Sequence, residues 1–249
     1  MQRYFIPTEQ FGEKSVRIIG DDAHHLMNVM RAKDGDQMIV ADGSGREAVV
    51  QVTALSKAEV LAEIVEERIS HGEPSVRVWI AQAMPKGDKM ETVIQRGSEI
   101  GATRFIPFTS ERTIVQYDAK KEGKRLERWA RIAKEAAEQA HRGRVPDIDP
   151  VRNWRELLKL AGQLKVAFLC YEKESNRHLR GLLRELQNES SEQILLIIGP
   201  EGGFSEKEVR EAEEAGCVTI SLGARILRTE TAAMVGLSCI LYEYGEIGG

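Results

Sequence analysis

The chain has 249 residues, of which 42% are hydrophobic, and its formal net charge at pH 7 is −4. This length permits one large domain or two small ones, and the hydrophobic share excludes a disordered chain. No hydrophobic run is long enough for a membrane span, and the N-terminus lacks a signal-peptide pattern. Three cysteines lie far apart without a CxxC pair, which argues against a zinc site or a disulfide framework. We therefore expect a cytoplasmic protein without a metal, in which Cys170 and Cys239 lie in the core.

The charge is unevenly distributed along the chain. Residues 120–144 hold nine Lys or Arg against four Glu, whereas residues 1–73 hold eight basic and thirteen acidic side chains. A net negative chain is not a general nucleic-acid binder, but a basic segment of this kind can dock a polyanion. Equally, the segment can be a solvated helix face with ion pairs between residues four apart.

Residues 1–72 have mostly strand patterns. A helix is expected over residues 21–31, capped by Asp21 or Asp22, with Leu26, Val29 and Met30 facing inward. The turn residues at 42–45 predict a hairpin. Strands are expected over residues 16–19, 37–41, 47–52 and 59–65. Several short strands and one helix predict a small β-barrel, and the break at residues 71–74 predicts a domain boundary after residue 72.

Residues 73–249 alternate between strand and helix patterns. The expected strands are 76–81, 105–108, 166–170, 194–198 and 218–222. The expected helices are 89–100, closed by Gly101, then 126–141, 154–160, 176–186, one after Ser205 and one from about Thr229. This alternation predicts an α/β domain with a mostly parallel sheet and right-handed crossovers.

A glycine-rich segment follows the hydrophobic run 194–198, whose lack of alternation is typical of a strand buried on both faces. Residues 199–203 read GPEGG, and Ser205 with Glu208 forms a capping box that starts a helix. Such a turn lets a ligand approach the backbone closely and presents free N–H groups. The segment matches neither GxGxxG nor the P-loop motif. A tight turn without a ligand stays the alternative.

A second loop, SLGARILRTET at residues 221–231, follows the next strand. Its glycine, its hydrophobic pair and its helix-capping threonine can wrap a flat heterocycle. Alone, it could equally be an ordinary connection between strand and helix. Because the carboxyl ends of parallel strands meet at one edge of a sheet, we expect both loops to form one binding site.

Several motifs in order carry a resemblance that covers nearly the whole chain. They are Arg3–Phe5, the HL..VMR motif at residues 25–31, KGDKME at 86–91, EIG at 99–101, EAAEQ at 135–139 followed by Arg142, GPEGGFS at 199–205 and SLGARILRTETA at 221–232. Together they resemble the bacterial ribosomal RNA (uracil-N3)-methyltransferase family, which belongs to the SPOUT class and acts on 16S rRNA. The resemblance implies a SPOUT methyltransferase domain with a trefoil knot over residues 73–249, preceded by a PUA-like RNA-binding β-barrel over residues 1–72. It also implies S-adenosyl-L-methionine as the cofactor and a homodimer through the knot region.

The resemblance places the cofactor site at the ends of three strands. Leu169, Ile226 and Leu227 would sandwich the adenine, and backbone amides around Gly199, Leu222 and Leu227 would hydrogen-bond it. The full set of candidate cofactor residues is Leu169, Cys170, Tyr171, Glu172, Gly199, Pro200, Glu201, Gly202, Gly203, Leu222, Gly223, Ile226, Leu227, Arg228 and Thr231.

Transfer of a methyl group to uracil N3 requires the N3–H proton to leave, so a nearby cation would lower the barrier. Arg228 is the candidate catalytic cation. It could instead pair with Glu201 or Glu230 and only shape the loop. Glu201 is the second catalytic candidate, either to accept a proton or to orient the substrate.

The candidate RNA contacts are cationic side chains from both parts of the chain. A role for His24 and His25 in the core or in stacking on RNA is preferred over metal binding. Phosphate contacts are expected from Arg3, Arg31, Lys33, Lys86, Lys89, Arg112 and Arg142.

We therefore expect methylation of N3 of a specific uridine in the decoding region of the 16S rRNA of the small ribosomal subunit. One alternative is a SPOUT methyltransferase that acts on a ribose 2′-hydroxyl or a tRNA base. Another is a non-catalytic RNA-binding protein of ribosome assembly.

Overall fold

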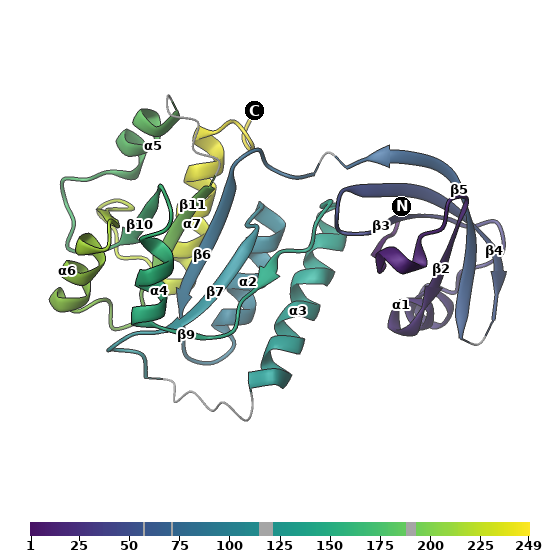
Figure 1. Ribbon diagram of the computed structural model, residues 1–249, viewed down its shortest axis with the longest axis horizontal. Coiled ribbons are helices and arrows are strands. Elements are labelled where there is room, and N and C mark those ends of the chain that lie inside the picture. Colours follow the sequence, from purple (N-terminus) through teal and green to yellow (C-terminus); the bar gives the residue numbers. More distant parts are fainter. Residues whose placement is uncertain (57, 71, 115–121, 188–192) are drawn as a thin grey trace. The chain divides into compact units, whose positions relative to one another are not determined.

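The computed structural model describes residues 1–56, 58–70, 72–114, 122–187 and 193–249 (Figure 1). Within them the chain forms two compact units. The first contains residues 1–73 and a later segment, 137–145, and the second contains residues 74–136 and 146–249. Three residues discussed above lie outside the described residues. They are His71 in the expected boundary, and Lys120 and Lys121 in the basic segment.

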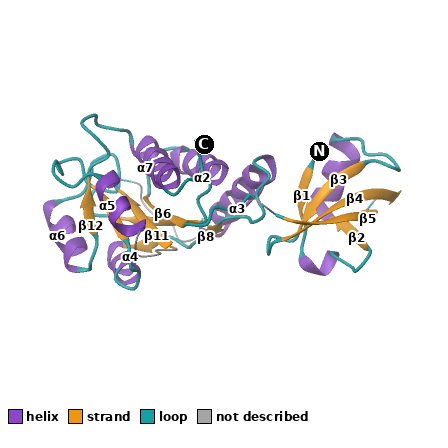
Figure 2. Cartoon of the chain, turned by 90° about the horizontal axis from the view of Figure 1, so that it is seen from above, coloured by secondary structure: helices purple, strands orange, loops and turns teal. Residues whose placement is uncertain are grey.

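The first unit is built on a curled five-stranded sheet with the order β1-β3-β4-β5-β2 (Figure 2). Register shifts between β4 and β5 bend both strands, which lets the sheet curl around its core. The strands are β1 (Arg3–Phe5), β2 (Ser15–Ile19), β3 (Gln37–Ala41), β4 (Arg46–Leu55) and β5 (Glu59–Ile69). The predicted strands and the hairpin at 42–45 are confirmed. β1, a three-residue strand parallel to β3, was not predicted, because it is too short to show a pattern.

The predicted helix of the first unit has an unexpected form. A short 3₁₀ turn, η1 (Thr8–Gln10), precedes β2, and α1 (Gly20–His24) follows it and continues as the π-helical turn η2 (His25–Val29). Ile19 occupies the N-cap position, so the expected cap by Asp21 or Asp22 is wrong. Leu26 is buried as expected, but Val29 and Met30 are 61% and 40% exposed. The reason is the wider turn, in which the Met30 N–H donates to the His25 carbonyl, five residues back, at 3.0 Å.

The second unit contains a seven-stranded sheet in which every strand pair is parallel. Its order is β12-β10-β11-β6-β7-β8, with β9 also paired to β7. The strands are β6 (Arg77–Ala83), β7 (Arg104–Thr109), β8 (Asp147–Ile148), β9 (Arg152–Asn153), β10 (Ala167–Cys170), β11 (Gln193–Ile198) and β12 (Val218–Ile220). The predicted α/β architecture with a parallel sheet is confirmed.

Helices cover both faces of this sheet. They are α2 (Lys89–Ile100), α3 (Glu122–Gln139), α4 (Trp154–Ala161), α5 (Leu179–Gln187), α6 (Glu206–Glu214) and α7 (Thr229–Glu243). α2 and α7 pack side by side on one face, and α4 lies on the other (Figure 2). Side chains of α4 and α6 share a hydrophobic cluster with β6, β7, β10 and β11. None of the helices in the described ranges is long and apolar enough to cross a membrane.

Local sequence signals explain several helix ends. α2 has the predicted bounds and ends at Gly101, whose φ of 127° requires glycine. α5 begins at Leu179, three residues later than predicted. The reason is a turn before it, in which the Glu174 carboxylate accepts hydrogen bonds from the N–H groups of Asn176 and Arg177. Cys239 is exposed on α7, so its expected place in the core is wrong; Cys217 is buried instead.

Candidate functional site

A cavity of about 610 Å³ lies at the carboxyl ends of β10, β11 and β12. These strands are neighbours in the sheet, so the loops that follow them meet at one edge. The lining comprises residues 170–172, 198–204 and 220–229, with Lys89 and Ala232. The structure thus brings together all but two of the predicted cofactor residues. Leu169 is fully buried in the core instead, and Thr231 is exposed on α7 and does not belong to the lining.

Residues 199–203, which we call the glycine loop, form one wall of the cavity. Gly203 has a φ of 65°, and its N–H donates to the Pro200 carbonyl at 2.9 Å. A Cβ at Gly203 would stand 2.8 Å from Oε1 of Glu172 on the neighbouring loop. The backbone conformation therefore favours glycine, and any larger residue would also push the Glu172 carboxylate out of its place.

The glycine loop is also held from outside the cavity. The predicted capping box of α6 is confirmed, with the Ser205 side chain accepting from the Glu208 N–H and the Glu208 carboxylate accepting from the Ser205 N–H. Ser205 Oγ donates to the Glu111 carboxylate at 2.9 Å, and the Glu111 N–H donates to Glu208 at 2.8 Å. Arg112 Nη1 donates to the Gly202 carbonyl at 2.9 Å. These contacts hold the loop in the shape that forms the wall of the cavity.

Residues 221–228, the second loop, form the opposite wall. Gly223 has a φ of 114°, and its N–H donates to Ser221 Oγ at 3.2 Å. Ile226 lines the cavity although the residue is 87% exposed, so it contributes hydrophobic surface at the mouth of the cavity. A hydrophobic surface of this kind, at the mouth of a cavity, suits the face of a planar ring.

The sequence left open that Arg228 pairs with Glu201 or Glu230, but the charged side chains at the cavity pair differently. Lys89 Nζ lies 2.9 Å from Glu201 Oε1 and 3.6 Å from Glu230 Oε2, so both carboxylates pair with Lys89. Arg228 lines the cavity and is exposed, and its side chain forms no hydrogen bond or ion pair with any residue in the described ranges. Its guanidinium is therefore free to interact with a ligand.

Two further groups at the cavity have perturbed acidity. Burial would raise the pKa of Glu201, but hydrogen bonds from Lys89 and from backbone N–H groups lower it overall, which makes Glu201 a weak base. Burial raises the pKa of the Cys170 thiol well above its usual range, so this thiol stays protonated and is not a nucleophile.

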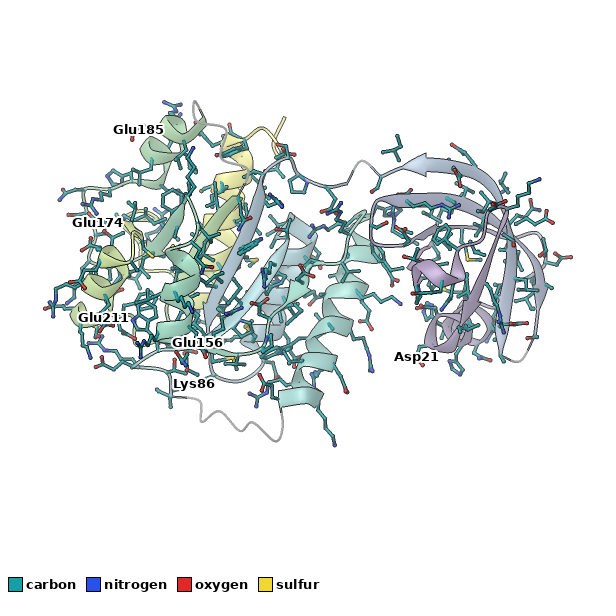
Figure 3. The ribbon with its side chains drawn as sticks, in the orientation of Figure 1. Asp21, Lys86, Glu156, Glu174, Glu185 and Glu211 are labelled. Atoms are coloured by element: carbon teal, nitrogen blue, oxygen red, sulfur yellow. The ribbon has the colours of Figure 1, made fainter. Side chains whose placement is uncertain are left out.

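The predicted RNA contacts fall into two groups. Arg31, Lys33, Lys86 and Arg112 are exposed (Figure 3 labels Lys86), and Lys89 is half-buried in its ion pairs. The predicted phosphate contacts of Arg3 and Arg142 are wrong, because their side chains are only 4% and 3% exposed. Arg3 pairs with Glu47 at 2.8 Å and Arg142 with Glu73 at 2.6 Å, so both guanidinium groups stabilise the first unit and cannot reach a phosphate.

Other residues, in the cavity and elsewhere in the chain, carry roles that the sequence did not suggest. Arg225 and Thr229 also line the cavity, and both lie in the motif at 221–232, so their position was the signal that could have identified them. His25 hydrogen-bonds through Nδ1 to the hydroxyl of the buried Tyr4 at 2.9 Å. Within the described parts of the chain, no group of three or more His, Cys, Asp or Glu residues is arranged to hold a metal ion.

Comparisons with known proteins agree with this geometry. Residues 71–241 match the family described as RNA methyltransferase domain, and residues 18–65 match the RNA methyltransferase PUA domain. Over 250 residues the chain is 41% identical to the ribosomal RNA small subunit methyltransferase E of Bacillus subtilis, an alignment that covers 98% of this chain and 97% of the relative.

Two similar solved structures contain a cofactor. A ribosomal RNA small subunit methyltransferase E from Neisseria gonorrhoeae bound to S-adenosyl methionine is 30% identical, with a TM-score of 0.85 over 97% of each chain. A Legionella pneumophila protein in complex with the bound cofactor SAM is 28% identical, with a TM-score of 0.87 over 96% of each chain. The chain therefore belongs to the ribosomal RNA small subunit methyltransferase E family, in which a PUA domain precedes a SPOUT-type RNA methyltransferase domain.

Proposed function

We propose that this protein methylates N3 of a specific uridine in the decoding region of 16S rRNA, with S-adenosyl-L-methionine as the methyl donor. The observation that carries the proposal is the cavity between the glycine loop and the second loop, with the free guanidinium of Arg228 in its lining. The names of its relatives support the rRNA of the small subunit as the substrate, and the ligands of two of them support the donor.

The residues of the cavity suit this donor. Gly203 lets the Glu172 carboxylate lie close to the glycine loop, and Ile226 and Leu227 offer hydrophobic surface to an adenine ring. Glu172 lines the cavity without an ion pair to any described residue, so its carboxylate can receive a positively charged or hydroxyl-bearing part of the donor. The volume of about 610 Å³ lies within the range of small-molecule sites.

The donor supplies an electrophilic methyl carbon on a positively charged sulfur. The electron pair of uracil N3 forms the new N–C bond while the pair of the breaking C–S bond returns to sulfur, and the N3 proton goes to solvent. As N3 loses its proton, negative charge spreads onto the neighbouring carbonyl oxygens. Arg228 is the group that stabilises this charge. Glu201 orients the glycine loop rather than accepting the proton, because its pKa is lowered by Lys89 and the backbone.

The remaining parts of the proposal concern RNA, domains and assembly. Residues 1–72 would serve as the RNA-binding domain, with Arg31 and Lys33 in contact with phosphates, and residues 73–249 as the catalytic domain, with Lys86 and Arg112. We include in this proposal the trefoil knot, a homodimer formed through the knot region and a cytoplasmic location.

Mass spectrometry of nucleosides tests the proposal. Purified protein, S-adenosyl-L-methionine and small ribosomal subunits that lack the modification should yield 3-methyluridine at one position of 16S rRNA. If the product is instead a ribose-methylated nucleoside, or is found only on tRNA, the protein catalyses one of the alternative SPOUT reactions. If no RNA product forms although the donor binds, the protein is a non-catalytic RNA-binding protein.

A further inference from the structure

We infer that Thr229 and Lys89 form a two-point latch, which fixes the first turn of α7 against the glycine loop and thereby positions Arg228 for methyl transfer. The inference rests on the proposed function, because it assigns Arg228 the role of stabilising the charge on the uracil ring. It goes further by assigning the positioning of this arginine to two residues that have no role in the proposed chemistry at uracil N3.

The first point of the latch is a buried chain of hydrogen bonds. Gln82, at the carboxyl end of β6, donates through Nε2 to the Thr229 hydroxyl at 2.7 Å. Thr229 in turn donates to the Gly199 carbonyl at 2.7 Å. Gln82 is fully buried and Thr229 is 7% exposed. The chain therefore joins three elements, β6, the start of α7 and the glycine loop, by bonds that are shielded from water.

Gln82 lowers the stability of the fold at its position. It lies in a strand whose other inward residues are hydrophobic, and its Oε1 is buried without a hydrogen bond to any described residue. A buried polar atom without a partner destabilises the fold, so a hydrophobic residue here would favour stability. What the amide provides in return is a donor for Thr229 Oγ1, which leaves the hydroxyl proton of Thr229 directed at Gly199.

The second point of the latch is the ammonium group of Lys89, at the first residue of α2. It pairs with Glu201 of the glycine loop at 2.9 Å and with Glu230 of α7 at 3.6 Å. Glu230 Oε2 is buried and accepts no hydrogen bond in the described residues, so the charge of Lys89 compensates it. The Lys86 N–H donates to Glu201 at 3.1 Å and completes this contact.

Arg228 forms the N-cap of α7 and lies directly before Thr229 and Glu230, the two residues of α7 that take part in the latch contacts. On its carboxyl side, Thr229 and Glu230 are held by the latch. On its amino side, residues 223–226 are exposed. The backbone from which Arg228 projects is therefore held on its carboxyl side, by the helical hydrogen bond from the Ala232 N–H to the Arg228 carbonyl and by the latch. A cation that is positioned before the substrate binds stabilises developing charge without the cost of reorganisation.

The packing of α7 does not depend on these polar contacts. Ala233, Leu237, Ile240 and Leu241 are fully buried or nearly so and anchor the helix against the sheet. The polar contacts lie in the first turn, beside the cavity, where they contribute to the orientation of the site rather than to the attachment of the helix. This separates a positioning role from a merely structural one.

The test compares Thr229→Val, which keeps the shape and loses the hydroxyl, with Thr229→Ser, which keeps the hydroxyl. Thr103→Val is the matched control, because Thr103 donates to the Val78 carbonyl in the same unit at the amino end of β7, away from the cavity. Rates of single-turnover methyl transfer are measured across pH with saturating S-adenosyl-L-methionine and small subunits, and melting temperatures are recorded for every variant.

We expect Thr229→Val to slow transfer by about 10- to 100-fold, the size of effect that misplacing a catalytic group produces. Its rate should also reach its plateau at higher pH than in the wild type, because a misplaced Arg228 stabilises the N3 anion less. Thr229→Ser should restore most of the rate, and Thr103→Val should match the wild type. Equal rates and equal pH profiles for Thr229→Val and Thr229→Ser would overturn the latch.

Lys89→Met provides an independent variant in case Thr229→Val does not fold, because it leaves the bonds of Gln82 and Thr229 intact. It should shift the pH profile in the same direction, and an unshifted profile contradicts the second point of the latch. The two proposals fail in different ways. A wild-type protein that forms no 3-methyluridine overturns the proposed function, whereas an active wild type with an equally active Thr229→Val overturns only the latch.

Discussion

Replacing Gly203 with alanine tests the claim that the glycine loop forms a wall of the donor site. Gly203 has a φ of 65°, and an added Cβ would stand 2.8 Å from Glu172 Oε1, closer than a carbon and an oxygen can pack. The left-handed backbone alone costs an L-residue about 1–2 kcal/mol of stability. The added methyl group displaces the Glu172 carboxylate, which we propose as a contact for the donor, from its place in the wall of the cavity. Loss of a hydrogen bond to this charged group costs about 1.5–3 kcal/mol, or roughly 10- to 150-fold in affinity.

Gly216→Ala is the matched control for Gly203→Ala. Gly216 also has a positive φ, 92°, but no atom lies within 4 Å of its added Cβ. It lies before the amino end of β12, whereas the cavity lies at the carboxyl end of that strand. Both variants should lose a similar amount of stability in urea unfolding. Isothermal titration calorimetry should show weaker binding of S-adenosyl-L-methionine to Gly203→Ala only. Equal affinities for the two variants would refute the reasoning, because backbone strain would then account for every effect.

Four further predictions concern charged and buried polar groups. Arg228→Gln should slow methyl transfer by about 10²- to 10³-fold in single-turnover assays, since it removes the group that stabilises the developing charge; an unchanged rate would exclude that role. Arg3→Met should destabilise the first unit by about 3–5 kcal/mol, because it leaves Glu47 buried without its partner. Arg31→Ala should instead leave stability unchanged and reduce the salt dependence of RNA binding by about one phosphate contact; the reverse pattern in chemical unfolding and filter binding would contradict both assignments. Burial, followed by the negative charges of Glu138 and Asp22, raises the pKa of Tyr4 from 10.0 to about 12. Because an unfolded tyrosine loses its proton first, the free energy of unfolding should fall by about 2–3 kcal/mol between pH 10 and 12 in the wild type relative to Tyr4→Phe; parallel curves for the two proteins would count against it.

Local patterns in the sequence predicted the parts of the fold that local interactions determine. The buried run that became β11, the capping box of α6 and the glycine that closes α2 each depend on residues within a few positions of one another. The meeting of the two loops was also predictable, because parallel strands bring their carboxyl ends to one edge.

Contacts between residues distant in the chain were not predictable in the same way. Arg3 looked like a surface cation, yet its guanidinium contacts the carbonyl of a residue 139 positions away. Lys89 looked like a phosphate contact, yet its partner in the glycine loop is 112 residues away. A charged residue has the same pattern in the sequence whether its partner is a phosphate or a distant carboxylate, so only the fold distinguishes the two.

The turn after α1 shows a third limit. The spacing of Leu26, Val29 and Met30 fits an α-helix, but the chain forms a π-helical turn there, and Arg31 follows with a φ of 54°. An i to i+5 hydrogen bond leaves no mark in the hydrophobic pattern. The exposed Val29 and Met30 follow directly from that change of geometry.

The most direct test of the account is a crystal structure of the protein with S-adenosyl-L-methionine and an RNA fragment that contains the target uridine. We predict the adenine between the glycine loop and the second loop, the donor's methyl carbon in line with uracil N3, and the Arg228 guanidinium beside a uracil carbonyl oxygen. A donor bound elsewhere, or an Arg228 turned away from the base while Glu201 contacts N3, would contradict it.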